Sequence, residues 1–114
     1  APINIFSLAY PETTSNWSNR FQMFRTQNMW TFILLDSYNG RLWQVQYSTQ
    51  DLDNLFCIPI NKYELVSDNE KCIFSIQPLT SMYQYYLIND NTGDMWKFQW
   101  STKGDDYRWI ERFR

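Results

Sequence analysis

The feature that most constrains this chain is an internal repeat. A shift of 53 residues, without a gap, aligns the first half of the sequence with the second. The identical pairs are Phe21 and Phe74, Met29 and Met82, Leu34 and Leu87, Gly40 and Gly93, Trp43 and Trp96, Gln46 and Gln99, Ser48 and Ser101, Thr49 and Thr102, and Asp53 and Asp106. Such self-similarity indicates one supersecondary unit used twice.

Each copy is expected to form four short strands. The predicted strands are residues 20–26, 29–36, 41–49 and 54–60 in the first copy, and 72–77, 82–89, 94–102 and 107–113 in the second. The third strand alternates with a period of two, which is typical of a strand with one buried face. Its aromatic face is predicted to be the core in both copies: Trp43, Val45 and Tyr47, and likewise Trp96, Phe98 and Trp100.

The loop before each third strand carries a turn signal. "LDSYNGR" and "INDNTGD" both have a polar residue in second place and glycine in sixth. This pattern suits a type I turn followed by a left-handed residue, a conformation that glycine adopts at low cost. Gly40 and Gly93 are therefore predicted to be structural turn residues, and Trp43, Trp96, Gln46 and Gln99 are assigned structural roles with them.

The organisation that follows is a single all-β domain over residues 1–114. Residues 1–19 form an N-terminal extension, 20–60 the first repeat, 61–71 a charged linker and 72–114 the second repeat. Two four-stranded meanders that each present one apolar face must cover each other. We expect a pseudo-twofold eight-stranded barrel or closed sandwich, an arrangement that also protects strand edges.

Composition excludes several functional classes. With 10 basic and 12 acidic residues and no basic run, the chain lacks the charge of a protein that neutralises phosphates, so no nucleic-acid partner is expected. No apolar stretch approaches the length of a membrane span. The absence of histidine removes the usual catalytic base, so we expect no enzyme, cofactor or metal. "NDNTGD" offers oxygen ligands, but a plain hairpin turn is favoured over a calcium loop.

Two cysteines, Cys57 and Cys72, flank the segment that joins the repeats. They could close that segment with a disulfide in an oxidising compartment, or they could remain free thiols. The start "APINIF" is consistent with a mature form after signal-peptide removal, so we expect an exported protein of the periplasm or cell envelope.

The two hairpins carry resemblances to known families. "TQNMWTFILLDSYNGRLWQVQYS" and "MYQYYLINDNTGDMWKFQWS" are similar to small, largely uncharacterised bacterial all-β proteins with a repeated TQNMWTFLLLDxxTGxxWQVQWS-type motif. The second copy departs from this motif with Lys97 in place of Gln44. The hairpins also resemble, more weakly, the tryptophan-docking hairpin of quinoprotein β-propeller blades, with one residue fewer between Gly and Trp. These resemblances imply a bacterial envelope protein and no catalytic residues.

A rigid scaffold without catalytic groups suits recognition of another protein. We expect a non-enzymatic protein-binding or inhibitor protein, such as an immunity protein that neutralises a secreted toxin or a hydrolase. The alternative is a carbohydrate-binding module of the cell envelope. Positions that differ between the repeats are the candidate partner-binding residues: Tyr38, Arg41, Gln44, Asp94 and Lys97.

Overall fold

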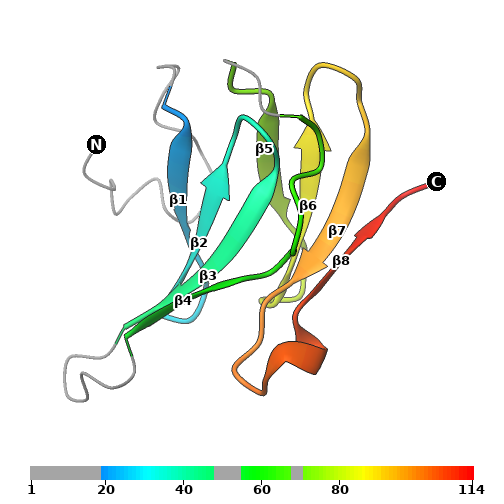
Figure 1. Cartoon of the computed structure of the whole chain (residues 1–114). Coiled ribbons are helices and arrows are strands. Elements are labelled where there is room, and N and C mark those ends of the chain that lie inside the picture. Colours follow the sequence, from blue (N-terminus) through cyan, green and yellow to red (C-terminus); the bar gives the residue numbers. More distant parts are fainter. Residues whose placement is uncertain (1–18, 48–54, 68–70) are drawn as a thin grey trace.

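The computed structural model describes residues 19–47, 55–67 and 71–114, which form two four-stranded antiparallel sheets (Figure 1). In each sheet the strands follow chain order. The first sheet contains β1 (Phe21–Arg25), β2 (Thr31–Asp36), β3 (Arg41–Gln46) and β4 (Phe56–Pro59); the second contains β5 (Phe74–Pro78), β6 (Gln84–Asn89), β7 (Met95–Gln99) and β8 (Trp109–Arg112). Within these residues the only helix is the 3-10 turn η2 (Asp105–Tyr107). The all-β prediction with two four-stranded units is confirmed.

The strands are shorter than the sequence pattern suggested. The second strand was expected from residue 29, but β2 starts at Thr31 because a tight turn precedes it. In that turn the Trp30 N–H donates to Asn28 Oδ1 at 2.8 Å, and the Thr31 N–H donates to the Asn28 carbonyl at 3.1 Å. Residues 48 and 49, predicted to end the third strand, lie outside the described part of the chain.

Both central hairpins use glycine in the left-handed region. Gly40 has φ of 83° and Gly93 has φ of 79°. The residue that opens each loop also caps it: Asp36 Oδ1 accepts from the Tyr38 N–H at 3.1 Å, and Asn89 Oδ1 accepts from the Asn91 N–H at 2.9 Å. Short polar side chains of this kind stabilise turns by bonding the backbone two residues ahead.

The strand register is the same in both sheets. Leu34 lies opposite Trp43 in the first sheet, and their repeat equivalents Leu87 and Trp96 lie opposite each other in the second. The same holds for the edge pair Met23 with Leu34 and its equivalent Ile76 with Leu87. The hairpin turns and the side-chain alternation therefore produce two sheets with equivalent residues in equivalent places.

The two sheets nevertheless bury opposite faces. In β3, Leu42 and Gln44 are fully buried, whereas Trp43 and Val45 are only half-buried. In β7 the pattern is reversed, because Trp96 and Phe98 are buried and their neighbours are not. The prediction that the aromatic face is the core is therefore correct for the second repeat and wrong for the first.

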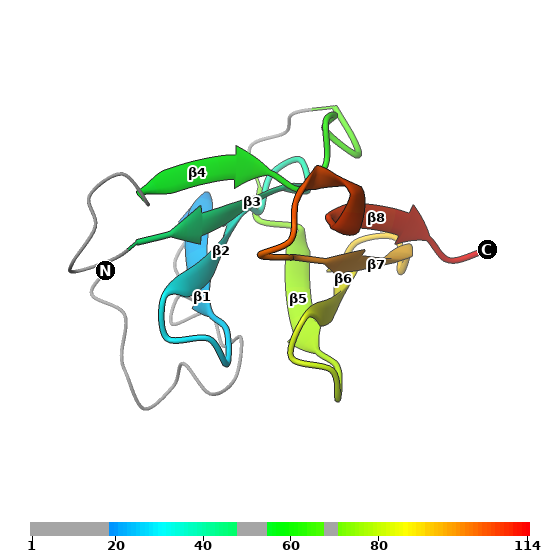
Figure 2. The same ribbon diagram turned by 90° about the horizontal axis from the view of Figure 1, so that it is seen from below.

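One core lies between the sheets. Its buried hydrophobic residues are Phe24, Ile33, Leu35, Leu42 and Ile60 from the first repeat, and Phe74, Ile76, Tyr85, Leu87, Trp96, Phe98 and Trp100 from the second. Seen from below, both sheets run in the same order, with β1 beside β5 at one edge and β4 and β8 toward the other (Figure 2). The aromatic face of the second sheet thus packs on the opposite face of the first.

The expected pseudo-twofold barrel or closed sandwich is not confirmed. A pseudo-twofold axis would bring equivalent faces together, and here equivalent faces are not in contact. Each sheet has four strands, and no hydrogen-bonded strand pair joins the two sheets in the described residues, so no closed barrel is found. The sheets are stacked so that their equivalent faces point in the same direction, and the aromatic face of the second sheet packs on the other face of the first.

The connection between the sheets fixes this stacking. The Leu65 N–H donates to the Asn39 carbonyl at 2.8 Å, and the Phe74 N–H donates to the Ser37 carbonyl at 3.1 Å. Both acceptors lie in the turn between β2 and β3, so the linker and the start of β5 pack over that turn. A Cβ at Gly40 would meet Leu65 and Phe74 side chains at 3.0 Å, whereas Gly93 has open space around it.

Candidate functional site

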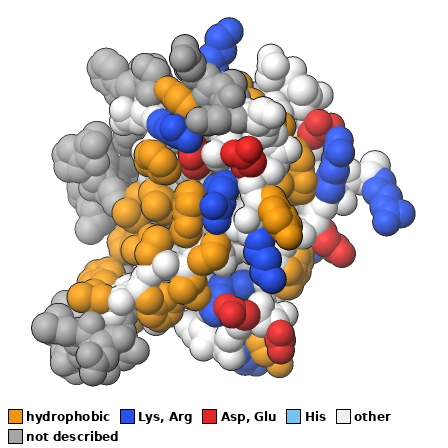
Figure 3. Space-filling model, viewed as in Figure 1, with side chains coloured by type: hydrophobic (Ala, Val, Ile, Leu, Met, Phe, Trp, Pro, Cys, Tyr) orange, Lys and Arg blue, Asp and Glu red, His pale blue; other side chains and the backbone are white. Residues whose placement is uncertain are grey.

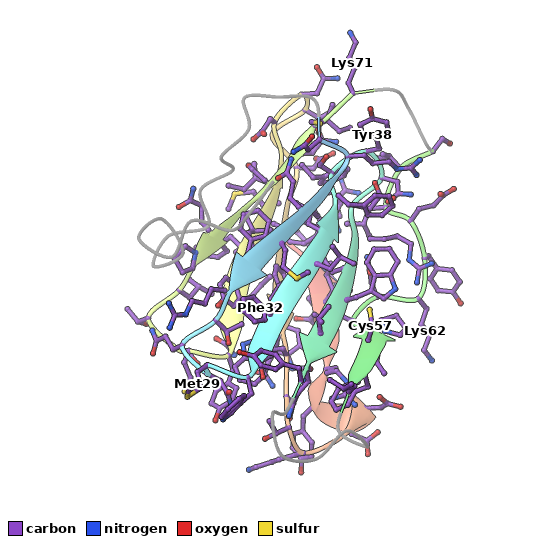
Figure 4. The ribbon with its side chains drawn as sticks, turned by 90° about the vertical axis from the view of Figure 1, so that its left-hand side faces the viewer. Met29, Phe32, Tyr38, Cys57, Lys62 and Lys71 are labelled. Carbon is purple, nitrogen blue, oxygen red and sulfur yellow. The ribbon has the colours of Figure 1, made fainter. Side chains whose placement is uncertain are left out.

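The most unusual surface of the molecule is the side of the first sheet that faces away from the second. We call it the first-sheet outer face. Paired strand positions and the burial pattern place these residues on it: Phe21, Met23, Arg25, Phe32, Leu34, Arg41, Trp43, Val45, Cys57 and Pro59. Figure 4 looks onto this sheet, with Phe32 and Cys57 labelled. Figure 3 shows hydrophobic side chains gathered on the same side of the molecule.

Large apolar side chains on this face are open to solvent. Phe21 is 53% exposed and Met23 is 38% exposed, whereas their repeat equivalents Phe74 and Ile76 are 2% and 0% exposed. Phe32, Leu34, Trp43 and Val45 beside them are half-buried. Exposed apolar side chains that gather on one face of a protein are typical of an interaction surface.

The rings on this face have the geometry of a buried core. The Phe21 and Trp43 centroids are 6.4 Å apart with an interplanar angle of 50°. The equivalent buried pair, Phe74 and Trp96, has a separation of 5.8 Å and an angle of 53°. The same ring pair is therefore buried in the second sheet and partly exposed in the first, where Trp43 is half-buried and Phe21 is exposed.

Arginines border the exposed rings. The Arg41 guanidinium lies 4.9 Å from the Trp43 ring centroid, within the range of a cation–π contact. Arg20 lies 5.3 Å from the Phe21 ring and 5.0 Å from the Tyr38 ring, and it is fixed by an ion pair of 3.0 Å with the buried carboxylate of Asp36. Trp, Tyr and Arg are the side chains most enriched at energetically important interface positions.

Cys57 lies on the edge strand of this face. Neighbouring side chains desolvate its thiol and raise its pKa, so less thiolate forms at neutral pH than in an ordinary cysteine. Both Cys57 and Cys72 are free thiols in the structure, and the Cys72 Sγ donates to the Asn19 carbonyl at 3.2 Å. Of the two alternatives, the structure contains the free thiols and not the Cys57–Cys72 disulfide.

The partner-binding residues proposed from the sequence do not form one cluster. Tyr38 and Arg41 lie at one end of the first-sheet outer face, close to Asp36. Asp94 is in the second sheet and forms an ion pair of 2.9 Å with Arg112. Hydrogen bonds from the Thr92 hydroxyl and then Arg112 lower its pKa. Lys97 lies on the face of the second sheet that points away from the first sheet.

Gln44 lies between the sheets, where no partner can reach it. Its Nε2 donates to the Ser101 carbonyl at 2.9 Å, and its Oε1 accepts from the Ser101 N–H at 3.1 Å. The side chain is fully buried. The prediction that Gln44 binds a partner is therefore wrong. Gln44 instead joins the two sheets, because a buried amide must satisfy its donor and acceptor within the protein.

Gln46 and Gln99, which were predicted to have structural roles, both form hydrogen bonds within the protein. The Gln99 Nε2 donates to the Tyr107 carbonyl at 2.9 Å, and its Oε1 accepts from the Gln84 Nε2 at 2.8 Å. Gln46 Oε1 accepts from the Gln44 Nε2 at 3.3 Å. Trp96 lies in the core, but Trp43 is half-buried on the first-sheet outer face, so its assignment to the core is wrong.

A second candidate site is a small pocket of about 160 Å³ at the end of the second sheet. Two exposed tyrosines line it, Tyr83 and Tyr107, and the Lys103 ammonium lies 5.6 Å from the Tyr107 ring. Gln99 and Ser101 contribute polar atoms to its wall. Aromatic, hydroxyl and amide groups are therefore close together in this pocket.

Other kinds of site have no support in the described part of the chain. It contains no group of three or more His, Cys, Asp or Glu residues that could hold a metal ion. Within the same residues, no helix is long and apolar enough to cross a membrane.

No protein-family model, curated protein or solved structure gives a significant match to this chain.

The exposed face was missed at the sequence level, although a signal for it exists. The segment Phe32-Ile33-Leu34-Leu35 in β2 is a continuous apolar run. Such runs are typical of strands that are covered on both faces, whereas alternation is typical of strands covered on one. Only Ile33 and Leu35 are covered by the second sheet, so the run leaves Phe32 and Leu34 available for another surface.

Proposed function

We propose that this chain is a non-enzymatic protein-binding module whose contact surface is the first-sheet outer face, as expected for an inhibitor or immunity protein. One observation carries the proposal: the Phe21–Trp43 ring pair keeps the geometry of its buried equivalent while Phe21 is 53% exposed. A partner that covers these rings removes apolar area from water, worth about 25 cal/mol per Å² of that area.

The chemistry of this face also defines the partner. Arg25 and Arg41 lie on the face, and Arg20 lies at its end next to Phe21, where it forms an ion pair with the buried Asp36 carboxylate. An apolar protein surface bordered by acidic side chains would match the rings and the arginines together. The rings are held by an ordered sheet, so little conformational entropy is lost when they are covered.

The test compares the wild-type chain with the double variant Phe32→Thr and Val45→Thr. Threonine favours strands, so the sheet is retained while the apolar surface is reduced. Proteins captured from extracts of cells that produce the chain are identified, and the affinity of each purified partner is measured by calorimetry. We expect at least a tenfold loss of affinity, about 1.4 kcal/mol, for the double variant.

The control is Asp106→Asn, an exposed position in η2 outside the first sheet. It is expected to bind like the wild type. Equal binding by the wild type and the double variant would contradict the proposal, because the loss of two apolar side chains from the face would then leave recognition unchanged.

Carbohydrate binding is a second candidate, favoured by the pocket between Tyr83 and Tyr107. Tyrosine rings can stack on a sugar, while Lys103 and the tyrosine hydroxyls can hydrogen-bond its hydroxyl groups. The test is a titration with a glycan panel followed by intrinsic fluorescence, with Tyr107→Ala as the variant that removes one wall. No response to any glycan in the panel would count against this candidate.

A further inference from the structure

The contact between the two sheets of this chain supplies a template for a further contact. Within the chain, the aromatic face of the second sheet packs on the Leu42 and Gln44 face of the first. Because the strand registers are the same, the first-sheet outer face is the equivalent of that aromatic face. Within the described residues, this aromatic face of the first sheet does not pack on another sheet, and its Phe21 and Met23 are exposed.

The opposite side of the molecule carries the equivalent of the Leu42 and Gln44 face. We call it the second-sheet outer face. Its residues are Ser75, Gln77, Tyr86, Ile88, Met95, Lys97 and Glu111. Ile88 and Met95 are the equivalents of the buried Leu35 and Leu42, and both keep an apolar side chain.

From these two faces we propose that the partner of the first-sheet outer face is the second-sheet outer face of another copy of this chain, stacked head to tail. This inference rests on the proposed function, since it names the protein that covers the exposed rings. Each new contact would repeat the contact that already joins the two sheets within one chain. A head-to-tail contact is heterologous, and a repeated heterologous contact generates a ring if the rotation closes and an open filament if it does not.

The central strands carry apolar side chains on both faces, as expected if both faces of each sheet pack against another surface. In β2, Phe32 and Leu34 point away from the core while Ile33 and Leu35 point into it. In β6 the run Tyr85-Tyr86-Leu87-Ile88 is also apolar or aromatic on both faces, although only Tyr85 and Leu87 are buried. Repeat proteins show this pattern because each unit must bury its faces against its neighbours.

The second-sheet outer face is more polar than its equivalent. Gln77, Lys97 and Glu111 stand where the first sheet has Phe24, Gln44 and Ile58. Lys97 can donate a hydrogen bond as Gln44 does to Ser101, but it cannot accept one. Glu111 supplies an acidic group that complements the arginines of the first-sheet outer face. The contact between copies should therefore be weaker than the contact within a chain, and assembly should depend on concentration.

The experiment measures the mass of the full chain by sedimentation across a concentration series. Two variants each block one face: Phe32→Thr with Val45→Thr on the first-sheet outer face, and Met95→Lys on the second-sheet outer face. The lysine adds a positive charge to the face that must contact Arg25 and Arg41. Each blocked variant alone should be monomeric, and the mixture should give a one-to-one heterodimer, because it contains one intact face of each kind.

A third variant is designed to strengthen the contact, so its expected effect cannot result from a failure to fold. Lys97→Gln restores the donor and acceptor present at Gln44, so association should tighten by on the order of fivefold. Adding the Phe32→Thr and Val45→Thr changes to it should abolish this gain. Asp106→Asn is the control and should assemble like the wild type.

Three outcomes would overturn the inference. The first is a wild-type chain that stays monomeric up to about 1 mM. The second is a mixture of the blocked variants that forms no heterodimer, and the third is a Met95→Lys variant that still dimerises, which indicates a face-to-face dimer. The chain could also prove monomeric while the variant with Phe32→Thr and Val45→Thr binds a different protein more weakly than the wild type does. In that case this inference fails and the proposed function stands.

Discussion

Gln44 in the first sheet pairs with the backbone of Ser101 in the second repeat much as a neighbouring strand would. Its amide donates to the Ser101 carbonyl at 2.9 Å and accepts from the Ser101 N–H at 3.1 Å. The Arg108 Nη1 also donates to the Ser101 carbonyl, at 2.7 Å. The Gln44 side chain thus links one sheet to the other through two hydrogen bonds to the same residue.

Replacing Gln44 should therefore destabilise the protein. Gln44→Leu leaves the buried Ser101 N–H without a partner, which should lower the free energy of unfolding by about 1–3 kcal/mol. The matched control is Lys97→Leu at the equivalent position on the second-sheet outer face, where the change should stay within about 0.5 kcal/mol. Urea denaturation at a concentration where the chain is monomeric measures both. Equal losses would show that Gln44 has no special role between the sheets.

The two turn glycines should respond differently to alanine. Both have positive φ, so each substitution should cost about 1–2 kcal/mol for the left-handed conformation. Gly40→Ala should cost more than Gly93→Ala, because its Cβ would lie 3.0 Å from Leu65 and Phe74 while Gly93 has open space. Thermal unfolding of the two variants side by side checks this. A larger effect at Gly93 would contradict the stacking of the linker over the first turn.

The equivalent tryptophans should also differ. Trp96 is 7% exposed in the core, so Trp96→Ala should destabilise the protein by about 3–5 kcal/mol. Trp43→Ala, on the first-sheet outer face, should cost much less in the monomer while it weakens the association of copies. Denaturation and sedimentation of both variants separate the two effects. Similar losses of stability would indicate that both aromatic faces are covered in one chain.

Cys57 should react slowly with alkylating reagents near neutral pH. Desolvation raises the pKa of its thiol, and the thiolate is the reactive form, so the alkylation rate at pH 8 should be below that of a free cysteine peptide. The rate should rise with pH and approach that of the peptide only above the raised pKa. Mass spectrometry follows the label, with Cys57→Ser as the control that isolates Cys72. A rate equal to or above that of the peptide at pH 8 would contradict this environment.

Local features of the fold could be predicted from the sequence. The repeat, the period of two and the loop glycines identify eight strands, two hairpin turns and a common register, because these depend on neighbouring residues and on turn chemistry. The candidate site was less predictable. Tyr38 and Arg41 lie on or beside the exposed face, but Gln44 lies in the interior, because differences between repeats do not reveal which face is covered.

The sequence alone is therefore enough to predict two equivalent four-stranded sheets, each with an aromatic face. Which face of each sheet is buried depends on how the sheets pack. Alternation separates the two faces of a strand, but β2 and β6 carry large apolar side chains on both, so either face could enter the core. The linker over the Gly40 turn and the Gln44–Ser101 pairing set the stacking, and they leave the rings of the first sheet uncovered.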